Sequence, residues 1–121
     1  MAIGDSKTIG YPDSLATNGY RDLLVENMAE PPTSVLVDFI GSHAVDALTM
    51  AQAAAQLRAF VAAHSVAPDW ILFSVGSADI AGVNGPVTEA AWTANLGSAL
   101  DTLHAAYPAA QIRVMRPLFI N

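Results

Sequence analysis

The sequence predicts an α/β fold in which a parallel sheet carries helices on both faces. Short apolar segments rich in β-branched residues alternate with segments of helical spacing along the chain. The strand-like segments are almost continuously apolar, which is typical of strands covered on both faces. No linker, repeat or low-complexity segment divides the 121 residues. We therefore expect one domain over residues 1–121.

The first third of the chain is expected to hold two strands and a helix. The segment Met1–Gly4 predicts a short buried strand. A helix over about Gly19–Ala29 follows a loop, and two consecutive prolines end it. The β-branched run Ser34–Ile40 then predicts a second strand, which stops at Gly41.

The remainder continues the alternation. Asp46 is expected to cap an alanine-rich helix over about 46–64, and Trp70–Val75 is the clearest strand of the chain. A helix over 88–106 leads to a fourth strand, Gln111–Met115, whose outer edge needs a cover. In the alanine-rich helix the inward face is expected to hold Leu48, Ala51, Ala55 and the region Leu57–Val61.

Composition excludes several classes of function. A net charge of −6 with only five lysines and arginines argues against a nucleic-acid partner. No apolar run approaches the roughly 20 residues of a membrane span. Without cysteine, and with His43, His64 and His104 isolated from one another, we expect no metal site and no cofactor. The compartment stays open: cytoplasmic, or secreted with a leader outside this sequence.

Three strand ends carry a glycine together with a hydroxyl group. They are Gly4-Asp5-Ser6, Gly41-Ser42-His43 and Gly76-Ser77-Ala78-Asp79. Ligands of open parallel sheets bind beyond the carboxyl ends of the strands, where these loops meet. The sequence therefore predicts a site at this edge, with Ser6 as the candidate nucleophile.

Taken in order, these segments resemble the conserved blocks of the SGNH (GDSL-type) hydrolases. Residues 2–8 resemble the first block, and residues 37–42 resemble the strand before the second, in wording close to some polysaccharide deacetylases. Residues 68–80 resemble the third block, normally Gly-x-Asn-Asp. The resemblance covers the whole chain. It implies a three-layer α/β/α flavodoxin-like fold with a parallel sheet incomplete at its C-terminal side.

The resemblance also implies roles for individual residues. Ser6 corresponds to the nucleophile, and the backbone of Gly41 or, in another alignment, Ala44 corresponds to an oxyanion donor. Ala78 stands where the family has an asparagine whose side chain donates to the oxyanion. Loss of one such donor typically costs about a hundred- to thousandfold in rate.

Two further residues at the predicted edge have alternative roles. Asp79 either hydrogen-bonds the first loop or fixes its own loop, and we favour this structural role. His43 either lines the rim of the cleft or serves as a substitute base in a Ser6–His43–Asp79 arrangement. The family's catalytic Asp-x-x-His block, which follows the last strand, has no counterpart in this sequence.

Two functions stay open. The first is serine-dependent hydrolysis of carboxylic esters, either small esters or acetylated glycans. Its base would come from a complementary C-terminal fragment, and that fragment or a second copy of the chain would cover the sheet edge. The second is a degenerate domain that binds acyl or glycan ligands without turnover. A third possibility is that Ala78 is an engineered replacement of asparagine in an otherwise active enzyme.

Overall fold

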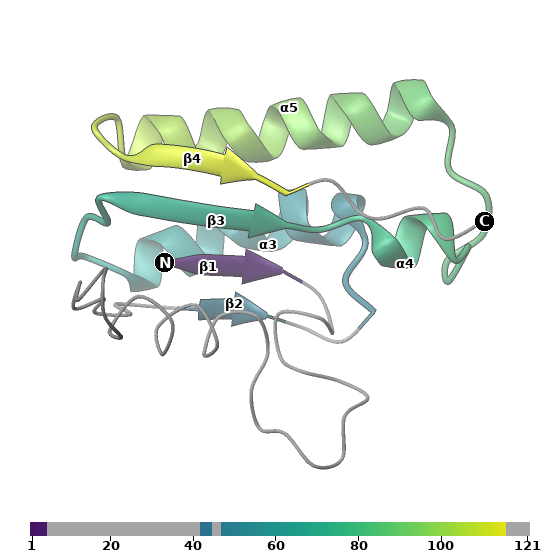
Figure 1. Ribbon diagram of the computed structural model, residues 1–121, viewed down its shortest axis with the longest axis horizontal. Coiled ribbons are helices and arrows are strands. Elements are labelled where there is room, and N and C mark those ends of the chain that lie inside the picture. The colour runs from purple at the N-terminus through teal and green to yellow at the C-terminus, as the bar shows by residue number, and fades with distance from the viewer. Residues whose placement is uncertain (5–41, 45–46, 116–121) are drawn as a thin grey trace, which may run out of the picture.

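The computed structural model describes residues 1–4, 42–44 and 47–115. These form a parallel sheet of order β2-β1-β3-β4, whose arrows point the same way in Figure 1. The strands are Ala2–Gly4 (β1), Ser42–Ala44 (β2), Trp70–Ser74 (β3) and Gln111–Val114 (β4). The helices are Met50–Ala63 (α3), Ser77–Ile80 (α4) and Glu89–Ala106 (α5). The predicted helix 19–29 and strand 34–40 lie outside the described residues.

The structure places strand residues beyond Gly41, where the sequence indicated that the second strand ends. Ser42 and His43, predicted to lie in a loop, form β2 together with Ala44, so this prediction is wrong. β2 pairs with β1, with Ser42 opposite Ala2 and Ala44 opposite Gly4. β1 is a buried strand that lies between β2 and β3 and pairs with both. This pairing register decides which residues join β2, and an apolar run does not reveal a register by itself.

The core lies between the sheet and one layer of helices. Ile71 and Phe73 on β3 join Leu57 on α3 and Leu103 on α5 in a single buried cluster. Burying a side chain of this size contributes about 1.5–3 kcal/mol. Side chains alternate along a strand, so the half-exposed Trp70 faces the opposite side of the sheet. Helices α3 and α5 therefore cover the same face.

Helix α3 starts at a different cap from the one predicted. Thr49 is the N-cap: its hydroxyl accepts a hydrogen bond from the Gln52 amide at 3.4 Å. The Gln52 side chain accepts one in return from the Thr49 amide at 2.9 Å, which completes a capping box. Ala47 has a φ of 54°, in the left-handed region that helices exclude. The predicted cap, Asp46, lies outside the described residues.

The inward face of α3 is set by its large side chains. Met50, Ala53, Leu57 and Phe60 are buried, whereas Ala51 and Ala55, predicted to point inward, are exposed. Alanines occur on every face of this helix, so their positions in the sequence do not indicate which face packs against the core.

Helix α5 and strand β4 follow the prediction closely. Thr88 caps the helix by accepting a hydrogen bond from the Ala91 amide at 3.2 Å. At the far end, the hydroxyl of Tyr107 donates to the carbonyl of His64 at 3.0 Å, and burial raises the pKa of this tyrosine. This bond joins the C-terminal ends of α3 and α5.

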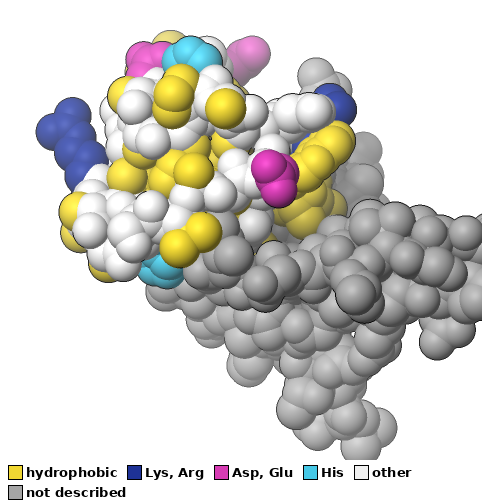
Figure 2. All heavy atoms as spheres, turned by 90° about the vertical axis from the view of Figure 1, so that its left-hand side faces the viewer, with side chains coloured by type: hydrophobic (Ala, Val, Ile, Leu, Met, Phe, Trp, Pro, Cys, Tyr) yellow, Lys and Arg dark blue, Asp and Glu magenta, His cyan; other side chains and the backbone are white. Residues whose placement is uncertain are grey.

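The described surface carries few charges. On the face toward the amino ends of the strands, charged side chains are scattered among apolar ones (Figure 2). No helix in residues 47–115 combines the length and apolar character needed to cross a membrane.

Candidate active site

The carboxyl ends of three strands are level with one another. Gly4 at the end of β1 lies opposite Ala44 on β2 and opposite Ser74 on β3. The chain segments that leave these strands therefore start from one line across the sheet. Ser6 follows Gly4 by two residues in the sequence. Ser6 and Gly41 themselves lie outside the described residues, and His43 and Ala44 belong to β2.

The segment after β3 forms a tight turn and then a single helical turn. Gly76 has a φ of 129°, which L side chains rarely adopt, so glycine is needed here. Its carbonyl accepts a hydrogen bond from the Ile80 amide at 3.2 Å and closes helix α4. The sequence predicted this block as a loop. A helix of four residues is too short to show a helical spacing of apolar residues in the sequence.

Ala78 lies inside α4 and is only 4% exposed. Its methyl group is buried, and its carbonyl accepts a hydrogen bond from the Val83 amide at 3.1 Å. The position supplies a backbone but no side-chain donor. An oxyanion contact from an amide side chain is therefore absent at this residue.

Asp79 joins the third loop to the start of helix α3. Its Oδ2 atom accepts a hydrogen bond from the backbone amide of Met50 at 2.8 Å. The first amides of a helix have no partner within the helix, and their partial positive charge favours a carboxylate. This contact spans 29 positions of sequence and fixes the segment after β3 against the segment after β2.

The described histidine side chains lie far from this edge. His64 follows the end of α3 and its Nδ1 lies 2.8 Å from the Phe60 carbonyl. The spacing Asp-x-x-His occurs at Asp101–His104, but both side chains are exposed on α5. His104 is fifteen residues beyond Glu89, or about 22 Å along the helix, toward the amino ends of the strands. Among the described residues, no cluster of histidines and carboxylates could hold a metal ion.

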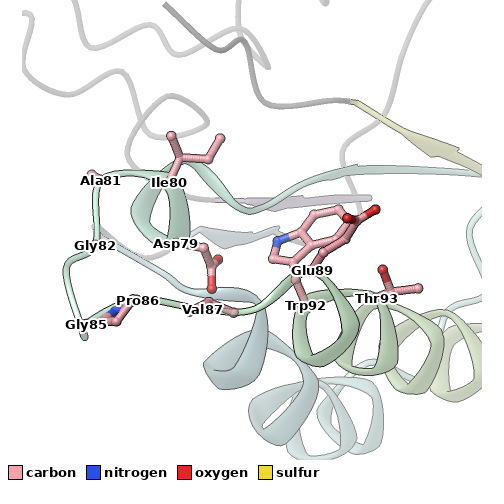
Figure 3. A pocket seen from close by; sticks show the side chains of 10 residues that line it. All are labelled: Asp79, Ile80, Ala81, Gly82, Gly85, Pro86, Val87, Glu89, Trp92 and Thr93. Atoms are coloured by element: carbon pink, nitrogen blue, oxygen red, sulfur yellow. The ribbon is translucent and has the colours of Figure 1, made fainter.

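A hollow of about 960 Å³ lies beside Asp79 (Figure 3). It extends from α4 across the loop that contains Gly82 and Gly85 to the first turns of α5. Its size is at the upper end of the usual range for small-molecule sites. The described residues around it are Asp79, Ile80, Ala81, Gly82, Gly85, Pro86, Val87, Glu89, Trp92 and Thr93.

A comparison with models of known protein families found one that matches almost the whole chain. The family model described as GDSL-like Lipase/Acylhydrolase matches residues 2–121. The chain belongs to the GDSL-like lipase/acylhydrolase family. The resemblance that the sequence blocks showed is thereby confirmed. A comparison with curated protein sequences found no match.

A solved structure supports the fold of this family member. The chain matches the crystal structure of the psychrotrophic esterase EstA from Pseudoalteromonas sp., inhibited by monoethylphosphonate, with a TM-score of 0.67 and 19% identity. The match covers 93% of this chain and 56% of the esterase. The chain thus spans little more than half the length of that structure. At this identity the likeness establishes the fold alone, which is the three-layer α/β/α arrangement of the SGNH hydrolases that the sequence predicted.

Sequence reasoning missed the second side of the site. It singled out Asp79 but not the Met50 amide, because nothing in an apolar helix start indicates a partner on another loop. It also passed over Glu89 and Trp92. Their spacing of three on a helix, directly after the glycine-containing loop, was the available signal.

Proposed function

We propose that this GDSL-family chain carries the nucleophile of a serine ester hydrolase, with Ser6 as that nucleophile. One observation supports this more than any other: the three strand ends are level, and β1 is the strand between the other two. Ser6 is two residues past Gly4, and two residues of chain span at most about 7 Å. Connectivity alone keeps the serine near this edge.

The chemistry would follow the acyl-transfer scheme. The Ser6 hydroxyl attacks the ester carbonyl carbon and gives its proton to a base. The resulting oxyanion takes hydrogen bonds from backbone amides, for which Ser6, Gly41 and Ala44 are the candidates. Collapse of the tetrahedral intermediate expels the alcohol, and water then hydrolyses the acyl-serine.

The base is the group that the described helices do not provide. His64 and His104 are excluded by their positions at the far ends of α3 and α5. We propose that the base comes from a complementary segment that also pairs with β4, or otherwise from His43 on β2. The small esters or acetylated glycans considered above are the proposed substrates, and the glycan preference rests on the wording of residues 37–42 alone.

Binding without turnover is the second candidate function. The buried Ala78, which offers no side-chain donor, is the observation that favours it. A missing oxyanion donor lowers the rate by about a hundred- to thousandfold but leaves ground-state binding intact. The two functions therefore differ in turnover rather than in ligand.

Hydrolysis of p-nitrophenyl acetate separates the two. An active chain releases p-nitrophenol above the buffer rate, and Ser6→Ala abolishes the release. Asp101→Asn, a change on the exposed face of α5, serves as the matched control and should retain the wild-type rate. Equal rates for Ser6→Ala and wild type would exclude Ser6 as the nucleophile and favour the binding function.

A further inference from the structure

The hollow beside Asp79 has an unusual combination of walls. Apolar side chains of Ile80, Val87 and Pro86 line much of it, and Trp92 adds an aromatic ring. Two carboxylates, those of Asp79 and Glu89, also line it. The ten lining residues include no lysine, arginine or histidine. A ligand in this hollow meets negative charge and no cationic side chain from these residues.

Two helix starts oppose part of that negative charge. The N-terminus of a helix carries about half a positive unit charge, and α5 begins at Glu89 beside the hollow. Helix α3 begins at Met50, whose amide donates to Asp79. Among these described groups, two full negative charges against two half charges leave a balance of roughly one negative unit. The carboxylates therefore outweigh the helix ends.

Glu89 and Trp92 act on the same part of the hollow. They are three residues apart on α5, which places their side chains as neighbours on one helical face. Figure 3 shows both projecting from the first turns of α5 beside the hollow. A cation placed here would lie beside both an indole ring and a carboxylate. Apolar walls suit methyl groups and disfavour a strongly hydrated metal ion.

We propose that this hollow binds an alkylammonium group, so that the esters accepted by the site are those of amino alcohols. Only the statement that the ligands are esters rests on the proposed function. The binding of the ammonium group is a property of Glu89, Trp92 and the apolar wall. It does not require Ser6 or turnover.

Three ligands of nearly equal shape test the proposal by equilibrium binding. The first is choline, and the second is 3,3-dimethylbutan-1-ol, the neutral alcohol in which tert-butyl replaces the trimethylammonium group. The third is the carboxylate 3,3-dimethylbutanoate (the tert-butylacetate anion), which carries a negative charge. The chain has two tryptophans, so in a Trp70→Phe background the fluorescence reports Trp92. Trp70 lies beneath Arg113, whose guanidinium carbon is 5.0 Å from the ring centroid. Neither residue belongs to the hollow.

Choline should change the Trp92 fluorescence saturably and bind roughly two- to thirtyfold more tightly than the neutral alcohol. Tert-butylacetate should bind more weakly than either. Glu89→Gln should remove most of the preference for the cation, whereas Asp101→Asn, on the same helix outside the hollow, should leave it unchanged. Equal binding of choline and the neutral alcohol would overturn the proposal. An equal loss in both variants would do so too, because it would indicate a general charge effect.

The two proposals can fail separately. If Ser6→Ala binds choline as wild type does and the wild type does not hydrolyse p-nitrophenyl acetate, the ammonium site stands and the hydrolase function fails. If the acetate is hydrolysed but choline does not bind, only the ammonium site fails.

Discussion

Replacing Asp79 by alanine should loosen the start of helix α3. The substitution removes the acceptor for the Met50 amide, a bond of 2.8 Å that joins helix α4 to the start of helix α3. Hydrogen bonds to charged acceptors contribute about 1.5–3 kcal/mol, and loss of a helix-capping side chain costs about 0.5–2 kcal/mol. Asp79 is half-buried, and the Thr49 capping box remains. We therefore expect a loss of about 1–2 kcal/mol in the free energy of unfolding.

Urea denaturation measures this loss. With a denaturant slope of about 2 kcal/mol per molar, the unfolding midpoint of Asp79→Ala should fall by roughly 0.5–1 M. Asp79→Asn keeps an acceptor oxygen without the charge and should lose about half as much. Asp101→Ala, an exposed carboxylate on α5, should change the free energy by less than about 0.5 kcal/mol. If Asp79→Ala and Asp101→Ala unfold at the same urea concentration, the bond to Met50 does not hold the helix.

Three other changes test the fold by the same urea assay. Tyr107→Phe removes the donor to the His64 carbonyl and should cost about 1 kcal/mol; an unchanged midpoint would show that water replaces this bond without loss. Gly76→Ala forces a side chain into a φ of 129° and should cost about 1–3 kcal/mol, so a neutral effect would contradict the turn described after β3. The amine of Met1 donates to the Trp70 carbonyl at 3.0 Å, and its burial lowers its pKa below the ordinary 8.0. The unfolded chain then binds more protons between the lowered pKa and 8.0, so stability should rise with pH through that window, and acetylation of the amine should abolish the rise.

The class of fold could be predicted because strand and helix leave strong patterns in this chain. Trp70–Ser74 alternates about Ile71 and Phe73, and Thr88 marks the start of α5 by its cap. Both signals depend on neighbouring residues, and the structure follows them.

The predictions were wrong where residues far apart in the sequence determine the bounds of a strand or the buried face of a helix. β2 comprises Ser42–Ala44 because these residues pair with β1, and pairing is a property of two segments rather than one. Helix α3 turns Met50 and Leu57 inward, rather than Ala51, because the larger side chains fill the core. An alanine-rich stretch has no marked face of its own.

The candidate site was predictable in its location but not in its contacts. Strand order and parallel direction bring the ends of β1, β2 and β3 level, but the predicted second end, Gly41-Ser42-His43, is not at that edge, because Ser42 and His43 lie inside β2. The bond from Met50 to Asp79 and the hollow lined by Glu89 and Trp92 depend on how α4 and α5 lie against α3. No local pattern records that arrangement.

The central claim is that Ser6 is a nucleophile, and covalent labelling tests it most directly. The chain, together with the complementary segment proposed to supply the base, is treated with a fluorophosphonate, a reagent that reacts with activated serine hydroxyls, and its intact mass and peptides are measured. The account predicts one adduct per chain, located on Ser6 and absent in Ser6→Ala. An adduct on another serine, or no adduct on a folded chain that still binds choline, would contradict it.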